Sequence, residues 1–201
     1  MNAERQSAPG TWRLFLAVTP AEPVKAALAE VQERLRRRLP IGTVKWTPPD
    51  QLHLTLRFLG DVPAPSAPDV AAALARVAEA ATSFALGAER LGVFPHVRRP
   101  RVIWVGLGGD LLELSQLQAA AVAATAPWGR REDQPFHAHL TLGRVRELPP
   151  ARLRGVGEAV ANCAPGRLAG WEVQAVELLR SELRPAGAIH TRLASAPLRR
   201  A

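Results

Sequence analysis

The 201-residue chain has a single cysteine, no long apolar run and no cluster of acidic residues, and each of these absences excludes a class of function. Cys163 is its single cysteine, which excludes an internal disulfide and a cysteine-based metal cluster. After a polar N-terminal tail at residues 1–10, the apolar run at residues 14–18 is too short for a secretion signal or a membrane span, and no other run approaches the length of a span. Acidic side chains do not cluster as a pair of magnesium ions would require. We therefore predict a cytoplasmic protein that uses no metal or other cofactor and binds no membrane.

Lysine is also scarce, because Lys25 and Lys45 are the only two and arginine supplies the remaining positive charge. The chain has 26 Lys and Arg against 18 Asp and Glu, a formal net charge of +8. This excess favours an anionic partner, with nucleic acid ahead of a membrane surface, and the guanidinium group of arginine binds phosphate through paired hydrogen bonds. Composition thus points to a globular, nucleic-acid-binding protein.

A tetrapeptide that occurs twice organises the chain. Residues 53–56 read His-Leu-Thr-Leu, and residues 139–142 repeat the same four residues. Alternation of polar and apolar residues predicts a half-buried β-strand, in which residues i and i+2 share a face. His53 and Thr55 are therefore expected on one face, and so are His139 and Thr141.

The pattern of the flanking segments predicts an internal duplication. Strands are expected at residues 12–18, 44–47, 52–59, 83–94, 101–107, 136–145, 171–179 and 189–195, and helices at 21–39, 69–81, 110–126 and 149–162. Each half reads strand, long helix, proline-marked loop, H-x-T strand, second helix, strand. We predict one α+β domain, residues 1–201, built from two lobes related by a pseudo-twofold. The lobes are roughly 12–95, with contributions from the C-terminal strand, and roughly 100–195. Each is a small, mostly antiparallel sheet backed by helices, and the H-x-T strands share a central cleft.

Two histidines in one cleft are suited to phosphodiester chemistry. An unperturbed imidazole has a pKa of about 6.5, so one ring can accept a proton from the attacking oxygen while the other donates one to the leaving oxygen. Thr55 and Thr141 can donate hydrogen bonds to the non-bridging oxygens as negative charge develops on them.

Each H-x-T strand also carries an arginine, and the number of residues between it and the histidine decides which face of the strand it occupies. Arg57 is an even offset from His53 and is expected on its face, whereas Arg144 is an odd offset from His139 and reaches the cleft only if Gly143 marks a β-bulge.

Five phrases of the sequence carry a family resemblance. They are Arg-Leu-Phe-Leu-Ala at 13–17, the stretch from Trp46 to Gly60, the segment 94–106 with its Phe-Pro and Arg-Arg-Pro-Arg runs, residues 139–144, and Ser-Glu-Leu-Arg-Pro at 181–185. With them the chain resembles the RNA 2′,3′-cyclic phosphodiesterase family, also called 2′-5′ RNA ligase, of the two-histidine (2H) phosphoesterase superfamily.

The resemblance implies hydrolysis of a 2′,3′-cyclic phosphate at an RNA end to a 2′-phosphate, without a metal. It implies His53 as the proton donor to the departing 3′ oxygen and His139 as the base that activates water. The other implied roles are phosphate contacts from Thr55, Thr141 and Arg144, and an aromatic contact of Phe15 near the terminal nucleoside. Ala138 departs from the family, which usually has proline before the second histidine.

The expected partners are RNA ends with a 2′,3′-cyclic phosphate, tRNA fragments among them, or small cyclic nucleotides, and we expect a monomer. The same chemistry could join a cyclic end to a 5′-hydroxyl through a 2′-5′ linkage. One alternative is a non-catalytic, basic RNA-binding module with inert histidines. Another is a metal held by His137 and His139, which share a strand face. His96 and His190 are predicted in loops or at the surface. Trp12, Trp104 and Trp171 are predicted in the core, which leaves Trp46 as the candidate to stack on a base.

Overall fold

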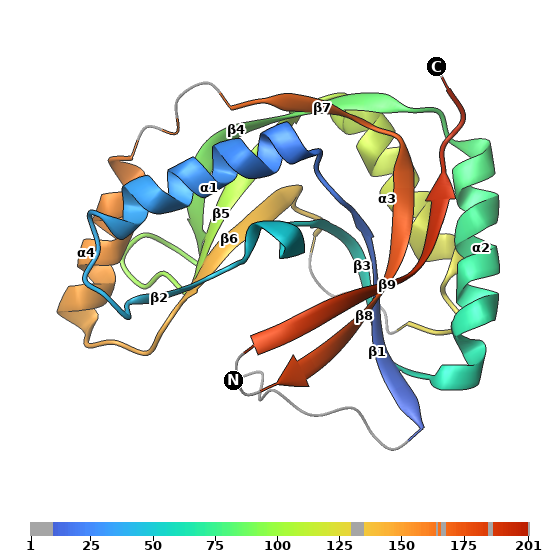
Figure 1. Cartoon of the computed structure of the whole chain (residues 1–201), viewed down its shortest axis with the longest axis horizontal. Helices are drawn as coiled ribbons and strands as arrows, with labels where there is room; N and C mark the ends of the chain where they lie inside the picture. Colours follow the sequence, from blue (N-terminus) through green and yellow to red (C-terminus); the bar gives the residue numbers. More distant parts are fainter. Residues whose placement is uncertain (1–9, 130–134, 164, 166–167, 185–186, 201) are drawn as a thin grey trace.

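The computed structural model describes residues 10–129, 135–163, 165, 168–184 and 187–200 (Figure 1). Within these residues nine strands form one sheet in the order β7-β4-β5-β6-β3-β1-β8-β9, and β2 pairs with β6. The strands are β1 (Thr11–Val18), β2 (Val44–Trp46), β3 (Leu54–Pro63), β4 (Phe84–Phe94), β5 (Val102–Gly109), β6 (His139–Val145), β7 (Gly170–Val173), β8 (Ala175–Arg184) and β9 (Gly187–Pro197). The α-helices are α1 (Glu22–Arg36), α2 (Ala67–Ala80), α3 (Leu111–Ala124) and α4 (Pro150–Ala161), and two 3-10 turns, η1 (Pro49–Gln51) and η2 (Ala64–Ser66), flank β3. Every pair of neighbouring strands is antiparallel, so the predicted α+β fold is confirmed.

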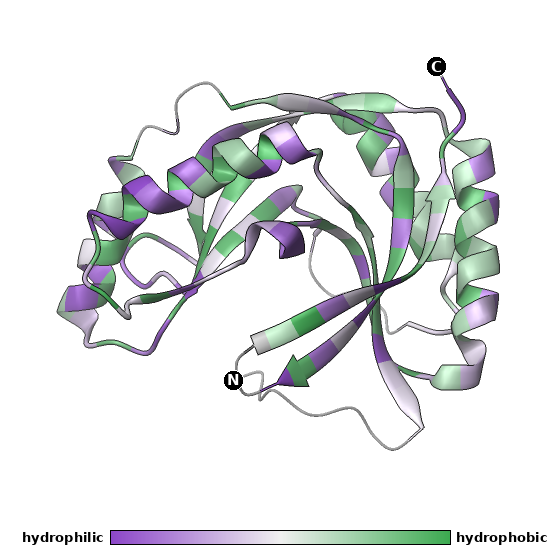
Figure 2. Ribbon diagram, in the orientation of Figure 1, coloured by the Kyte–Doolittle hydropathy of each residue, from purple (hydrophilic) through white to green (hydrophobic). Residues whose placement is uncertain are grey.

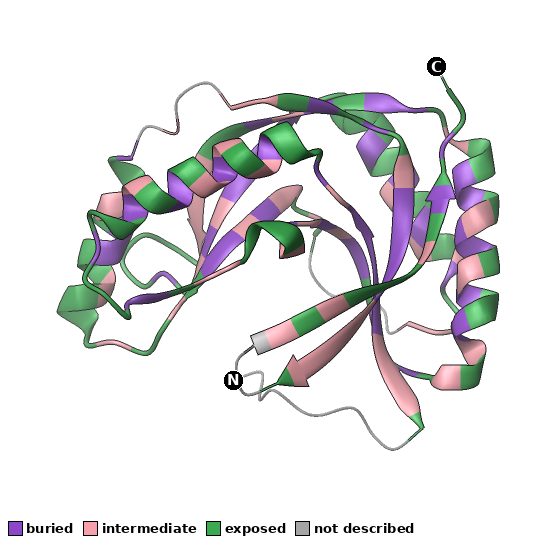
Figure 3. Ribbon diagram, viewed as in Figure 1, coloured by how far each residue is buried: buried purple, intermediate pink, exposed green. Residues whose placement is uncertain are grey.

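The helices form where apolar side chains recur with helical spacing. In α1 the buried positions include Val24, Leu28, Val31 and Leu35, which lie on one stripe, and a proline occupies the first turn, where it costs no hydrogen bond. Each such side chain contributes about 1.5–3 kcal/mol when it is fully buried. Apolar, buried residues line the sheet-facing sides of the helices (Figure 2, Figure 3). No helix in the described part of the chain has the length and apolar character that crossing a membrane requires.

The sheet divides into two halves, each with its own pair of helices (Figure 1). In one half, β7, β4, β5, β6 and β2 lie with α1 and α4, and α4 packs on β4. In the other half, β3, β1, β8 and β9 lie with α2, which packs on β8 and β9, and with α3, which packs on β3. The halves join where β3 pairs with β6, the two strands that carry the repeated tetrapeptide.

β8 and β9 continue the sheet from β1, in keeping with the contribution expected of the C-terminal strand, whereas other segments depart from the predicted division of the chain. The strand predicted at 171–179 is two strands, because β7 pairs with β4 in one half whereas β8 pairs with β1 in the other. β4, predicted in the first lobe, pairs with β5 and β7. Along the chain the strands therefore change from one half to the other four times, between β1 and β2, β2 and β3, β3 and β4, and β7 and β8, and the lobes are not consecutive in sequence.

Candidate active site

The two histidines are held in the same way on adjacent strands. Leu54 pairs with Leu140, and extending this antiparallel register by one residue brings His53 opposite Thr141 and Thr55 opposite His139. The Nδ1 atom of His53 lies 2.7 Å from the carbonyl oxygen of Gln51, and that of His139 lies 2.7 Å from the carbonyl oxygen of His137. When the rings are neutral these contacts assign the proton to Nδ1, which leaves Nε2 of each ring to exchange protons with a ligand.

A bulge in β6 turns Arg144 toward the histidines. In the pairing of β5 with β6, Ile103 lies opposite Gly143 and Trp104 lies opposite Thr141, so Leu142 is the extra residue. Leu142 and Gly143 therefore both face the core, where a side chain at Gly143 would meet Val44 and Trp46. The facing of the next residue is inverted, and Arg144 lies on the face of His139. Its charge lowers the pKa of His53, His139 and His190, in agreement with this position.

A matching bulge in β3 removes Arg57 from the site, and the prediction that it shares a face with His53 is wrong. Leu16 lies opposite Arg57 and Ala17 opposite Thr55, so Leu56 is the extra residue. The Arg57 side chain therefore points to α3, where its guanidinium donates hydrogen bonds to the carbonyl oxygen of Val122 and to Oγ1 of Thr125. It is only 3% exposed and secures the helix to the sheet.

His53 lies in an aromatic enclosure formed by the half of the sheet that contains β1 and β9. Its ring centroid is 4.9 Å from that of Phe15 and 5.1 Å from that of His190, and the two imidazoles meet edge to face. His190 also contacts Phe15 at 5.0 Å, so the prediction that His190 is a surface or loop residue is wrong. Phe15 is 1% exposed and belongs to a small buried cluster with Ala17 and Leu179. It supports the His53 ring but exposes almost no surface to a nucleoside.

A neighbouring aromatic ring does expose such a surface. The Phe58 centroid lies 5.7 Å from that of Phe15, and the Phe58 side chain is 51% exposed. The bulge that turns Arg57 to the helix turns Phe58 to the face of His53 and Thr55. Sequence parity, which assumes a regular strand, assigned Phe58 to the opposite face and so missed it.

His139 lies against a different aromatic pair, Phe94 and Trp104. Their centroids are 5.2 Å and 6.4 Å from that of His139, and they lie 5.0 Å from each other. The indole lies over Gly92 so closely that a Cβ there would meet it at 2.1 Å, and glycine at this position makes room for the ring. Trp104 is half-buried beside His139 rather than enclosed in the core as predicted.

Burial is the largest cause that lowers the pKa of His53, His139 and His190, and nearby positive charges lower it further. Burial is the largest cause that lowers the pKa of His53, the hydrogen bond to Gln51 opposes it, and the charges of His139 and Arg144 lower the pKa further. Burial also lowers the pKa of His139, with His137 and Arg144 adding to the decrease against the hydrogen bond to the His137 carbonyl. For His190, burial together with the charges of His53 and Arg144 lowers the pKa to about 4. All three rings are therefore biased toward the neutral form in the free protein.

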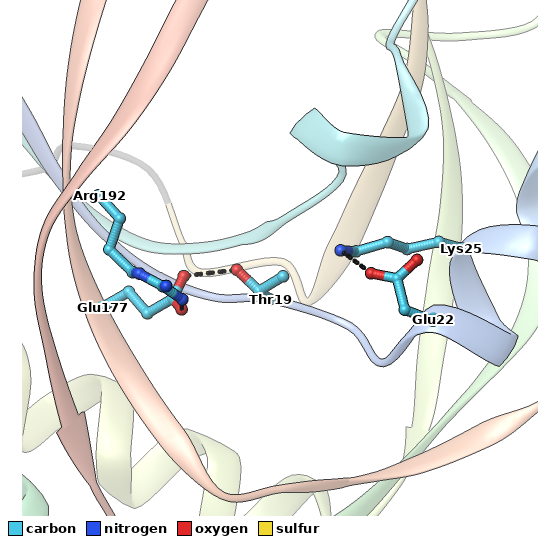
Figure 4. A network of polar contacts seen from close by, with 5 residues as sticks. All are labelled: Thr19, Glu22, Lys25, Glu177 and Arg192. Atoms are coloured by element: carbon cyan, nitrogen blue, oxygen red, sulfur yellow. Dashed lines mark hydrogen bonds and ion pairs between the residues drawn. The ribbon is translucent and has the colours of Figure 1, made fainter.

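A buried carboxylate acts on His53 alone. Glu177 of β8 is 7% exposed, and it raises the pKa of His53 as the smallest of the contributions. It accepts hydrogen bonds from Thr19 Oγ1 at 2.5 Å and from Arg192 Nη1 at 3.0 Å, whereas Lys25 pairs with Glu22 at 2.7 Å (Figure 4). The network keeps a negative charge near one histidine and not near the other.

The remaining predicted residues have separate positions. Thr55 and Thr141 are half-buried beside the histidines, and their hydroxyls form no hydrogen bond with another described residue. Trp46 packs against the main core on the opposite face of β2 from the cleft, with the Arg36 guanidinium 5.5 Å from its ring, so nothing supports a contact with a base. His137 is exposed, and the described residues contain no group of three or more His, Cys, Asp or Glu side chains arranged to bind a metal.

A sheet that brings two equally anchored H-x-T strands together defines a two-histidine phosphoesterase. The family model for the LigT-like phosphoesterases matches residues 18–104 and 111–190, and the chain belongs to this family. It is 35% identical to the RNA 2′,3′-cyclic phosphodiesterase of Thermus thermophilus, over 93% of this chain and 90% of that protein.

Solved structures agree with this membership. A crystal structure of a Thermus thermophilus protein, 33% identical, superimposes with a TM-score of 0.73 over 93% of this chain and 98% of the other. The structure of Escherichia coli LigT complexed with 3′-AMP, 25% identical, gives a TM-score of 0.75 over 94% of this chain and 98% of LigT. The chain is therefore a family enzyme rather than the non-catalytic binding module considered above.

Proposed function

We propose that the protein hydrolyses 2′,3′-cyclic phosphate ends of RNA to 2′-phosphates by paired-histidine acid and base catalysis, without a metal. The observation that carries this proposal is the pair of imidazoles on adjacent strands, each with Nδ1 engaged by a backbone carbonyl and Nε2 left for proton transfer. Relatives that bear the name RNA 2′,3′-cyclic phosphodiesterase support the choice of substrate. RNA is also the polymer that a net charge of +8 would attract.

The reaction divides between the two rings. His139 Nε2 takes a proton from water as the water oxygen forms a bond to phosphorus. The bond from phosphorus to the 3′ oxygen breaks, and the His53 ring, which enters this step protonated on both nitrogens, donates its Nε2 proton to that oxygen, so the products are a 2′-phosphate and a 3′-hydroxyl. The resemblance assigns the acid role to His53, and Glu177 supports this assignment because it favours the protonated form of His53 and has no counterpart at His139, against the opposing effects of burial, His139 and Arg144. Exchange with solvent restores both rings.

The phosphate itself needs donors for its non-bridging oxygens. The Thr55 and Thr141 hydroxyls are unengaged by other described residues, and the Arg144 guanidinium brings a positive charge to the same face. Phe58, Phe94 and Trp104 offer aromatic surface for the terminal nucleoside, one wall beside each histidine. Arg57 and Trp46 have no part in this arrangement.

A ligation reaction uses the same groups. If a 5′-hydroxyl replaces water as the nucleophile, His139 takes its proton and the product is a 2′-5′ linkage. Its extent then depends on how often an RNA 5′ end, rather than water, occupies the attacking position. We regard it as a side reaction of the hydrolase.

The test is incubation of the protein with a short RNA ending in 2′,3′-cyclic phosphate, in the presence of EDTA. We expect conversion to a 2′-phosphate, identified by its resistance to an enzyme that removes only 3′-phosphates. No turnover, or turnover that EDTA abolishes, would contradict the proposal. Retained RNA binding without turnover would contradict it as well.

A further inference from the structure

Lys45 and Arg144 are paired cations on neighbouring strands. Lys45 of β2 lies directly opposite Arg144 of β6 in the antiparallel register, and such partners have side chains on the same face about 5 Å apart. The alternation of β2 agrees with this position, because Val44 and Trp46 on either side of Lys45 pack against the core. Lys45 therefore lies on the same face of the sheet as Arg144 and the two histidines, and both side chains are exposed.

The row of positive charge continues past Arg144. Arg146, two residues further along, shares a face with Arg144 by strand alternation, and its backbone N–H donates to the carbonyl oxygen of Thr43 at 3.0 Å, which extends the pairing of β2 with β6. Arg146 is exposed as well. Lys45, Arg144 and Arg146 thus form a row that leads away from the histidines.

None of these three side chains is neutralised within the described part of the chain. The ion pairs found there use other cations, namely Lys25, Arg36, Arg37, Arg180, Arg184 and Arg192. Like charges directly opposite each other on neighbouring strands repel and destabilise a sheet. An unneutralised pair next to a phosphate site is accounted for if each cation binds a phosphate in the bound state.

We propose that Lys45 binds the phosphate on the 5′ side of the terminal nucleotide, while Arg144 contacts the cyclic phosphate and Arg146 extends the track. This inference rests on the proposed function and makes it more specific, because it names an RNA strand rather than a mononucleotide as the preferred substrate. Arg144 lies close enough to the histidines for its charge to lower the pKa of both rings, which places it at the reacting group. Successive phosphates of one strand would then meet successive cations.

The experiment compares two substrates, a nucleoside 2′,3′-cyclic phosphate and a dinucleotide that ends in the same cyclic phosphate. Only the dinucleotide has the additional phosphodiester. We expect the wild-type protein to prefer the dinucleotide in kcat/KM, and Lys45→Ala to reduce that preference about fivefold through KM. Lys45→Arg should restore it. For the dinucleotide, the slope of log kcat/KM against log salt concentration should decrease by about 0.7 in Lys45→Ala, because one fewer phosphate is neutralised.

Arg76→Ala provides the matched control, since it removes one exposed positive charge on α2, in the other half of the molecule. It should leave the substrate preference and the salt slope unchanged. Equal loss on both substrates in Lys45→Ala, an unchanged preference, or the same effect from Arg76→Ala would overturn this inference alone. Absence of turnover of both substrates by the wild type would overturn the proposed function and this inference with it.

Discussion

His53 and His139 have the same backbone anchor but different surroundings. His53 is the more enclosed ring, packed against Phe15 and His190 and close to the carboxylate of Glu177. His139 faces Phe94 and Trp104 and has a second imidazole, His137, two residues away. The duplication supplies two chemically equal groups, and the unlike walls of the two halves give them different surroundings, which the proposed function uses for one acid and one base.

The bulges show the same contrast. Each H-x-T strand has an extra residue at the leucine that follows the threonine, Leu56 in β3 and Leu142 in β6. The residue five positions after each histidine therefore faces the cleft. It is Phe58 in one strand and Arg144 in the other, so one half offers an aromatic surface and the other a cation. The two strands thus have the same bulge, but the side chains at the equivalent position differ in chemistry.

The largest expected effect is loss of either histidine. We expect His53→Ala and His139→Ala each to lower kcat/KM by about 10²–10⁴-fold, the range for removal of a general acid or base. Single-turnover hydrolysis of a 2′,3′-cyclic phosphate RNA measures it, with circular dichroism as a check on folding. His96→Ala, in the exposed loop after β4, should retain wild-type activity. Full activity in either cleft variant would remove that ring from the mechanism.

Replacing the cation of the cleft should have an intermediate effect. Arg144→Gln should lower kcat/KM about 10- to 100-fold, as for a lost hydrogen bond to a charged group. Because the Arg144 charge lowers the pKa of His53, His139 and His190, all three values should rise in the variant without substrate. An NMR titration of the imidazoles measures this, and Arg76→Gln is the control. Unchanged pKa values would show that Arg144 does not reach the histidines.

The smallest expected effect is on stability. The pKa of His190 is lowered to about 4 in the folded chain, whereas an unfolded histidine has a pKa of about 6.5. The unfolded chain thus binds more protons below pH 6.5, so the unfolding free energy should decrease as the pH falls from 7 to 5. His190→Phe keeps a ring against Phe15 and His53 but cannot titrate. Its decrease should be smaller by about 1 kcal/mol, roughly half the unscreened value because the ring is partly solvated.

Urea denaturation at pH 7 and pH 5 measures this difference. His96→Gln serves as the control, because that exposed ring lies outside the cleft. The same decrease for wild type and His190→Phe would show that His190 titrates normally in the folded protein.

The facing of the two repeated tetrapeptides could be predicted from the sequence because polar and apolar residues alternate there without interruption. Residues 53–56 and 139–142 therefore had the expected facing, and the bulge suggested at Gly143 is present one residue earlier. Arg57 was misplaced because a bulge leaves no mark in the pattern of a strand whose next residues, Phe58 and Leu59, are both apolar. His190 was missed because it reaches the cleft only through β9, a strand whose position depends on pairing with β8 and not on local sequence. The break between β7 and β8 could not be predicted from the local sequence either, because β7 pairs with β4 in one half and β8 pairs with β1 in the other.

The most direct test of the unequal roles uses a substrate in which sulfur replaces the bridging 3′ oxygen. A thiolate leaves without a proton, so the acid becomes dispensable while the base does not. We predict that His53→Ala regains at least about 100-fold of its lost rate on the sulfur substrate, whereas His139→Ala stays as impaired as on the oxygen substrate. Equal rescue of both variants, or rescue of His139→Ala alone, would contradict the division of labour between the two rings.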